Sequence, residues 1–125
     1  GFSYLLCRMP SGNYLVYFNP RCINDDLTYL GLDGEKKAWT VQSLYGGKIV
    51  ENVCQSFARD ILAANMPEAE RRGFDIVLTV HDELVTESDE PRSAELASIM
   101  SILPEWAAGL PLAAAGFDCK RYRKG

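Results

Sequence analysis

The chain has 125 residues, 47% of them hydrophobic and 24% charged, which is typical of one small globular domain with a modest core. The formal net charge is −4, which argues against a small free-standing nucleic-acid-binding protein, because such proteins are usually basic. The sequence contains no apolar run long enough to span a membrane, and no signal peptide is visible at the N-terminus.

The four cysteines and the single histidine also exclude some classes of site. No two cysteines form a C-x-x-C pair, so we expect no structural zinc site. Without a secretory signal, the cysteines are expected to be reduced thiols of a cytoplasmic protein. The first residue is not Met, which we interpret as a hint of a processed or excised piece.

Residues 1–45 are predicted to be rich in β-strand. Turn residues separate short apolar runs there, with Pro-Ser-Gly-Asn at 10–13 and Asp-Gly at 33–34 as the clearest turn signals. Residues 20–26 are expected to form a loop. The strand candidates are 4–8, 14–18, 27–32 and 37–44.

The clearest helix is predicted after Gly46-Gly47, in KIVENVCQSFARDILAAN. Apolar residues recur there with the i, i+3, i+4, i+7 spacing of one buried face, and Asn65 and Pro67 are expected to end the helix. A polar stripe runs along the other side, and its simplest interpretation is a solvated face. The predicted apolar face consists of Val50, Val53, Cys54, Phe57, Ala58, Ile61 and Leu62, and the polar stripe of Lys48, Asn52, Gln55 and Arg59.

Residues 74–80 are predicted to be a largely buried strand that pairs with a second strand at 83–87. A second helix is expected to start at Ser88-Asp89-Glu90-Pro91, with Asp89 or Ser88 as its cap, Pro91 in its first turn and Pro104 as its stop. A last strand is expected at 110–117. The predicted fold class is α+β, with β-hairpins and two main helices packed on one face of an antiparallel sheet.

His81, Asp82 and Glu83 lie where the two paired strands meet, and we call these three residues the hairpin tip. Hairpin turns are wet and Asp suits them, which is the simplest interpretation. Carboxylates on a rigid turn also suit Mg²⁺, which prefers oxygen ligands in strict geometry. Two-metal phosphoryl transfer needs at least one further acid from elsewhere.

The sequence Val-His-Asp-Glu-Leu around the hairpin tip resembles motif C of the family A DNA polymerases. Upstream, VCQSFARDILAANM is similar to the helix that precedes motif C in that family, with matches at Gln55, Ala58, Asp60 and Ile61-Leu62. The segments MPSGNYLVYFNPR and LPEWAAGLPLAAAGFDCKRYRKG look most like the bacteriophage and prophage branch. The resemblance covers nearly the whole chain and implies a partial polymerase palm.

The resemblance implies a role for each matching residue. Asp82 would be the palm carboxylate that binds catalytic Mg²⁺, and Glu83 its neighbour with a weaker metal role. His81 would lie beside the primer terminus, and Gln55 at the minor groove of the primer–template, where acceptors occur on every base pair. Phosphate contacts are expected from basic residues, namely Lys48, Arg59 and the tail residues Lys120, Arg121, Arg123 and Lys124.

The chain departs from the family pattern in three places. The Asn that precedes the Gln by one turn is replaced by Glu51, and Asn52 is one residue out of register. Motif A, which supplies the other metal-binding Asp, is absent, and Asp25-Asp26 does not match it. Lys37 and Tyr45-Gly46 imitate part of motif B, but the upstream Arg that motif B requires is missing.

We therefore interpret residues 1–125 as a single-domain C-terminal polymerase fragment. Residues 1–45 would be the β-rich segment between motifs B and C, and residues 46–125 the palm portion. The full enzyme, encoded by a phage or prophage in a bacterial cytoplasm, would bind primer–template DNA and deoxynucleotides. The alternatives are a non-catalytic prophage remnant that binds DNA or protein, and a small metal-dependent phosphoesterase using His81, Asp82 and Glu83.

Overall fold

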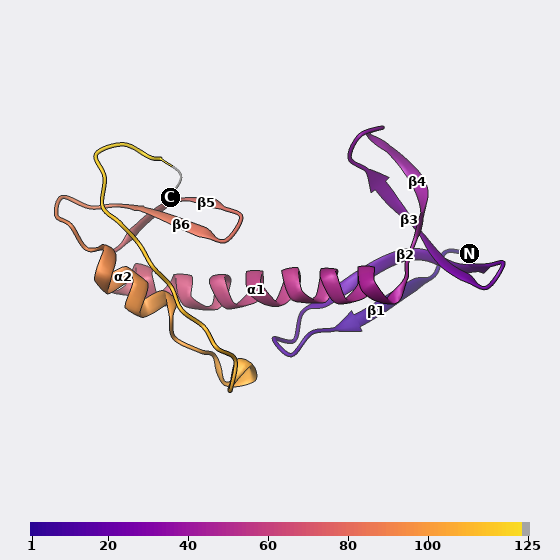
Figure 1. Cartoon of the computed structure of the whole chain (residues 1–125), viewed down its shortest axis with the longest axis horizontal. Coiled ribbons are helices and arrows are strands. Elements are labelled where there is room, and N and C mark those ends of the chain that lie inside the picture. The colour runs from indigo at the N-terminus through magenta and orange to yellow at the C-terminus, as the bar shows by residue number, and fades with distance from the viewer. Residues whose placement is uncertain (124–125) are drawn as a thin grey trace. The chain divides into compact units, whose positions relative to one another are not determined.

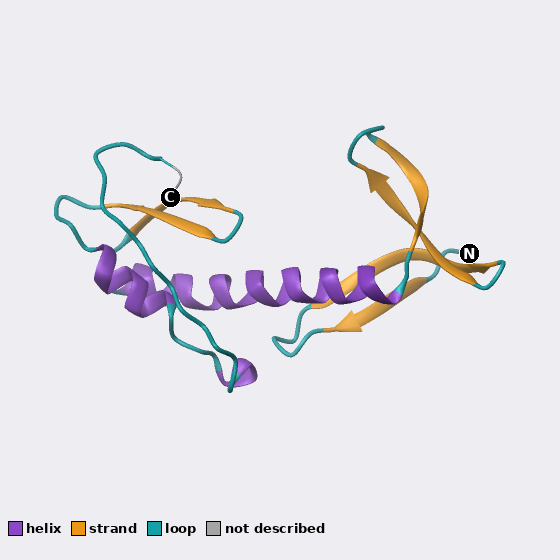
Figure 2. Cartoon of the chain, viewed as in Figure 1, coloured by secondary structure: helices purple, strands orange, loops and turns teal. Residues whose placement is uncertain are grey.

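A computed structural model describes residues 1–123, and it confirms the α+β class (Figures 1 and 2). The strands form two antiparallel sheets rather than one, a four-stranded sheet and a two-stranded sheet. The chain divides into two compact units, Gly1–Phe57 and Ala58–Gly125. In chain order the elements are β1 (Tyr4–Arg8), β2 (Tyr14–Ile23), β3 (Asp26–Asp33), β4 (Ala38–Ser43), α1 (Gly46–Arg71), β5 (Asp75–Val80), β6 (Glu83–Glu87), α2 (Ser93–Met100) and the 3-10 helix η1 (Glu105–Ala107).

The first unit contains a meander in which β1, β2, β3 and β4 pair in sequence order. The predicted loop at residues 20–26 is wrong, because β2 continues to Ile23. The strand passes Pro20 by a bulge, and the register shifts between Phe18 and Arg21. Asn24 and Asp25 then form a two-residue turn, both with positive φ (52° and 67°). Asn and Asp tolerate that conformation better than other side chains, so a hairpin closes here without Gly.

The buried apolar residues of the first unit are few. Met9, Tyr17 and Leu44 are buried, and the ring of Tyr17 meets the ring of Tyr29 edge-on with centroids 5.2 Å apart. Many large apolar side chains of the same unit are exposed. They include Phe2, Tyr4, Leu6, Val16, Leu32, Trp39 and Val41.

Helix α1 continues to Arg71, so the predicted stop at Asn65 and Pro67 is wrong, and Pro67 lies inside the helix. Proline has a helical φ, and what it lacks is the N–H that would bond to the preceding turn. Two residues beyond the end of the helix, Gly73 has φ +79°. The N–H of Phe74 bonds to the carbonyl of Ala69 (3.1 Å), the reversed C-terminal turn for which Gly is best suited.

The predicted apolar face of α1 is confirmed only in part. Ile61 is buried and Val53, Phe57 and Leu62 are half-buried, whereas Val50, Cys54 and Ala58 are exposed. The buried residues of α1 are Ile61, Asn65 and Ala69, spaced by four. The buried Asn65 amide donates to the carbonyl oxygens of Met100 (3.1 Å) and Ile102 (2.9 Å). An amide paired in this way avoids the cost of burying an unsatisfied polar group, which explains a polar residue on the buried side.

The second unit is organised around Ala69, Phe74 and Ile99, with Ile76 and Leu96 packed against them. The prediction that residues 74–80 are largely buried is wrong beyond Phe74, because most of β5 is exposed. Strand β5 pairs only with β6, and a bulge shifts the register between Ile76 and Leu78. A two-stranded ribbon with a shifted register cannot bury a continuous apolar face.

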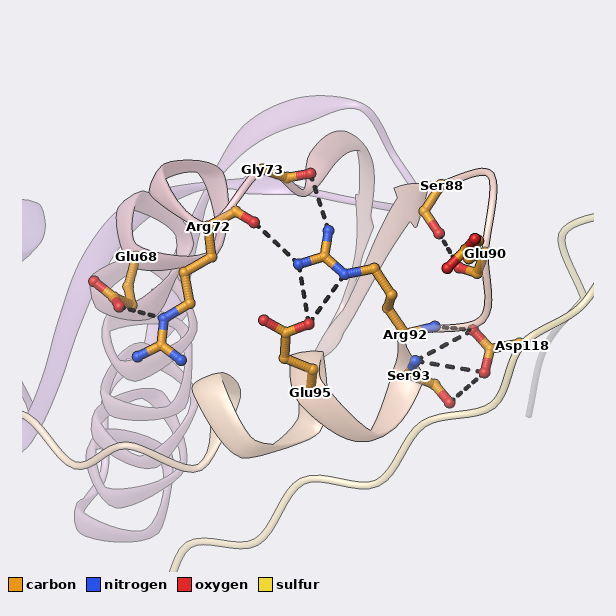
Figure 3. Close-up of polar contacts among 9 residues, drawn as sticks. All are labelled: Glu68, Arg72, Gly73, Ser88, Glu90, Arg92, Ser93, Glu95 and Asp118. Carbon is orange, nitrogen blue, oxygen red and sulfur yellow. Dashed lines mark hydrogen bonds and ion pairs between the residues drawn. The ribbon is translucent and has the colours of Figure 1, made fainter.

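Arg92 ties the end of α1 to the start of α2 (Figure 3). Its guanidinium donates to the carbonyl oxygens of Arg72 (3.0 Å) and Gly73 (3.3 Å) and lies 3.9 Å from the centroid of the Phe74 ring. It also pairs with Glu95 at 3.0 Å. A cation is favourable beside the terminal carbonyls of a helix, so this contact holds the base of β5 in place.

The predicted start of the second helix is wrong, because α2 begins at Ser93 and Pro91 lies before the helix rather than in its first turn. Neither Ser88 nor Asp89 caps it. Asp118, 25 residues downstream, accepts hydrogen bonds from the backbone N–H groups of Arg92 (3.0 Å) and Ser93 (3.2 Å). Asp118 thus caps the N-terminus of α2 from a distant segment of the chain.

The expected last strand at 110–117 is also wrong, since those residues are extended but pair with no strand among residues 1–123. The Ala114 N–H donates instead to the hydroxyl of Ser101 at 3.0 Å. The Ser101 hydroxyl thus accepts the hydrogen bond that a neighbouring strand would otherwise accept. Within the same described range, no helix is long and apolar enough to cross a membrane.

Candidate active-site hairpin

Strands β5 and β6 place the hairpin tip at a very tight turn. Val80 is paired with Glu83, so the loop consists only of His81 and Asp82. His81 has φ +55°, a left-handed conformation that a non-glycine residue adopts at some cost. The turn confirms the predicted tight connection and holds the Asp82 backbone between two paired strands.

The three side chains of the hairpin tip differ in exposure and in partners. His81 and Asp82 are exposed, and Glu83 is half-buried. The hydroxyl of Tyr122 donates to a carboxylate oxygen of Glu83 at 3.2 Å. Desolvation, together with this hydrogen bond to the charged Glu83, raises the pKa of Tyr122. The phenol therefore stays protonated, as a donor must.

The hairpin tip supplies oxygen ligands but only part of a metal site. Within residues 1–123, no group of three or more His, Cys, Asp or Glu side chains is arranged to hold a metal ion. Mg²⁺ usually takes one or two protein carboxylates together with water and substrate phosphates. The donor set of Asp82 and Glu83 fits that partial role and does not make a closed site.

Lys48 and Gln55 lie on the first unit's part of α1, one on each side of Glu51. The Lys48 ammonium is 3.0 Å from one Glu51 carboxylate oxygen, and the Gln55 amide is 3.5 Å from the other. The hydrogen bond and the charge of Glu51 raise the pKa of Lys48. Asn52 does not belong to the polar stripe, because it is half-buried and bonds to the hydroxyl of Tyr17 at 3.0 Å.

Arg59 is exposed on α1 in the second unit, and among residues 1–123 no hydrogen bond or ion pair joins it to the hairpin tip. Lys120 and Arg121 are exposed near the end of the chain, while the guanidinium of Arg123 lies over the ring of Phe117, 5.0 Å from its centroid. Lys124 lies outside the described residues.

Sequence reasoning missed Tyr122. In the segment CKRYRKG the sequence predicts phosphate contacts from the basic residues and gives Tyr122 no role. No local signal distinguishes it, because a single exposed aromatic residue is ordinary on a protein surface. Asp118 was missed for a similar reason, because its partners are 25 and 26 residues away.

Comparison with known proteins gives one informative match. No family model matches the chain, and no solved structure matches it. Over 130 aligned positions, the chain is 40% identical to a protein of Bacillus phage SP02 named DNA polymerase, and the match covers 96% of this chain. The chain is related to a phage DNA polymerase.

This relationship confirms the resemblance to phage polymerases that the sequence motifs indicated. The match covers 20% of the phage SP02 polymerase, so the chain corresponds to about one fifth of that protein's length. Nearly every segment of the chain lies within the match, including the hairpin tip and both helices.

Proposed function

We propose that this chain is the C-terminal palm portion of a family A DNA polymerase, and that its hairpin tip contributes to nucleotide addition at a primer 3′-hydroxyl. The observation that carries the proposal is the two-residue turn at His81-Asp82, in a chain 40% identical to a phage DNA polymerase. Two paired strands hold the Asp82 backbone at a defined position, and phosphoryl transfer requires such positioning of its charged groups.

Each residue of the hairpin tip has a distinct role in this proposal. Asp82 is the principal ligand for Mg²⁺ and Glu83 the secondary one, and the bound ions would neutralise the charge that develops on the transferred phosphoryl group. His81 is exposed beside Asp82, where an imidazole can meet the primer terminus. The second palm carboxylate would come from a part of the polymerase outside this chain.

Residues of α1 supply contacts to DNA in the same proposal. Gln55 is exposed, and an amide can test base-pair geometry in the minor groove without reading sequence. Lys48 and Arg59 offer positive charge to phosphates. In this proposal residues 1–45 lie between motifs B and C, and residues 46–125 form the palm portion.

The partners of the chain are primer–template DNA, a deoxynucleotide and the rest of the polymerase. Exposed apolar residues of the first unit, such as Trp39 and Val41, are a surface that other parts of the enzyme would cover. In the isolated 125-residue chain the same surface would favour self-association. We expect the isolated chain to show no primer extension, because one palm carboxylate and the nucleotide-binding residues are missing.

The test is Asp82→Asn in the full-length protein that carries this sequence, with Asp89→Asn as the matched control. Asp89 is an exposed acid just after β6, so the control makes the same chemical change outside the hairpin tip. We expect Asp82→Asn to lower the extension rate by at least about 100-fold, as loss of a main catalytic charge does, and Asp89→Asn to leave it unchanged. Glu83→Gln should fall between the two. Near-normal extension by folded Asp82→Asn protein would remove the assignment.

The second candidate is a non-catalytic remnant that binds DNA or protein. The observation in its favour is that residues 1–123 contain no group of three potential metal ligands. The coding sequence upstream of Gly1 separates the two candidates. An open frame with a D-Y-S-x-x-E pattern supports the polymerase, and a stop codon supports the remnant.

A further inference from the structure

The C-terminal segment of the chain folds back onto the hairpin tip. Tyr122 lies 39 residues after Glu83, and its hydroxyl donates to the Glu83 carboxylate at 3.2 Å. We infer that Tyr122 is a positioning residue that holds the Glu83 carboxylate for its role at the metal site. This inference rests on the proposed polymerase function and adds to it a residue that neither the motif nor the comparison identifies.

The segment that carries Tyr122 is anchored four residues upstream of it. Asp118 accepts hydrogen bonds from the N–H groups of Arg92 and Ser93 and from the Ser93 hydroxyl (2.5 Å), as Figure 3 shows. These bonds join the segment to the start of α2. Within the segment, the guanidinium of Arg123 lies over the Phe117 ring, so the residues on either side of Tyr122 also contact each other.

The anchor of that segment is itself connected to the base of the hairpin. Arg92 bonds to the carbonyls of Arg72 and Gly73 and stacks on Phe74, the residue just before β5. Ile99 of α2 packs with Phe74 in the core. The base of the hairpin and the C-terminal segment are therefore both attached to the same packed core.

Glu83 needs such a partner more than Asp82 does. A glutamate side chain has one more rotatable bond than an aspartate, so the Glu83 carboxylate has more positions to choose from even though Glu83 is half-buried. A tyrosine hydroxyl is carried on a stiff ring, and a hydrogen bond to a charged acceptor is stronger than a neutral one. The bond occupies one carboxylate oxygen and leaves the other free for an ion.

The test is Tyr122→Phe in the full-length protein, which removes the hydroxyl and keeps the ring. Tyr14→Phe is the matched control, because Tyr14 and Tyr122 are 53% and 52% exposed. We expect Tyr122→Phe to slow primer extension at limiting Mg²⁺ by roughly 3- to 10-fold, the loss typical of one partly screened hydrogen bond to a charged group. The Mg²⁺ concentration for half-maximal rate should rise by a similar factor, and the control should change neither quantity.

A double-mutant cycle with Glu83→Gln decides whether the hydroxyl acts through Glu83. In the Glu83→Gln background, Tyr122→Phe should cause little further loss. Three outcomes would each overturn the inference. The rate losses of the two single variants could multiply in the double variant, or Tyr122→Phe could leave the Mg²⁺ dependence unchanged. The third is that Tyr122→Phe lowers the melting temperature and has no other effect. Asp82→Asn in the same assay separates the two proposals. If Asp82→Asn abolishes extension and Tyr122→Phe has no effect, only the positioning role of Tyr122 is wrong. If Asp82→Asn leaves extension unchanged, the proposed polymerase site itself is wrong.

Discussion

The side-chain amide of Asn52 donates a hydrogen bond to the hydroxyl of Tyr17 at 3.0 Å, and so Asn52 faces the four-stranded sheet. Gln55, three residues later, is exposed, and its nearest partner is a Glu51 oxygen at a marginal 3.5 Å. The Asn52 amide thus stabilises the first unit, and the Gln55 amide remains available to DNA. This difference removes Asn52 from the candidate DNA contacts and retains Gln55.

Gln55→Ala should weaken primer extension without weakening α1, because Ala is the better helix former and Gln55 is exposed. The loss should be largest with mismatched or damaged primer ends, where minor-groove contacts test pairing geometry. Melting temperature and extension of matched and mismatched primers are the measurements. Asn52→Ala is the contrasting variant, and it should lower stability instead. If Gln55→Ala extends matched and mismatched primers as fast as the wild-type protein does, Gln55 does not contact the DNA.

Glu51→Gln should raise the affinity of the protein for DNA. Glu51 binds both the Lys48 ammonium and the Gln55 amide. In the proposed DNA-binding role of α1, its negative charge would also repel the phosphates of the DNA. Removing its charge should increase affinity about 2- to 5-fold at low salt and make the plot of log affinity against log salt steeper by up to about one unit. Glu105→Gln, an exposed acid on η1, is the control for net charge. The same gain in both variants would indicate a non-specific charge effect.

Asp118→Asn should destabilise the protein in a pH-dependent way. The hydrogen bond from Ser93, with the N–H groups of Arg92 and Ser93, lowers the pKa of Asp118 below its ordinary value of 3.8. A carboxyl whose pKa is lower in the folded state contributes stability above its unfolded pKa, and this contribution is lost as the pH falls through the folded pKa. The difference in melting temperature between wild type and Asp118→Asn should therefore be constant above about pH 5 and shrink below it. Asp89→Asn is the control, and a difference that grows in acid would contradict the sign.

Pro67→Ala should stabilise the second unit. Pro67 lies inside α1, where it cannot donate the hydrogen bond that the carbonyl four residues earlier would accept. Restoring that bond in a good helix former should add up to about 3 kcal/mol to the free energy of unfolding. Pro111→Ala, in the extended C-terminal segment, is the control for effects on the unfolded chain. A destabilised Pro67→Ala protein would mean that the proline ring packs in a way that the helix needs.

Local sequence patterns determined the elements that depend on local chemistry. The β1 and β6 strands, the long helix after Gly46-Gly47 and the tight turn at His81-Asp82 were all predictable, because alternation, helical spacing and turn residues act over a few neighbours. The hairpin tip also carried the resemblance to polymerases, since its chemistry lies within five consecutive residues.

Other features depended on partners distant in the chain. Helix α1 passes Pro67 because the stop that ends it is the left-handed Gly73, stabilised by packing of Phe74 with Ala69 and Ile99. Asp118 caps a helix that begins 25 residues earlier. Tyr122 bonds to Glu83, 39 residues away, and only the tertiary structure brings its hydroxyl to the hairpin tip. A local sequence pattern cannot predict this contact, because the two residues become neighbours only when the chain folds.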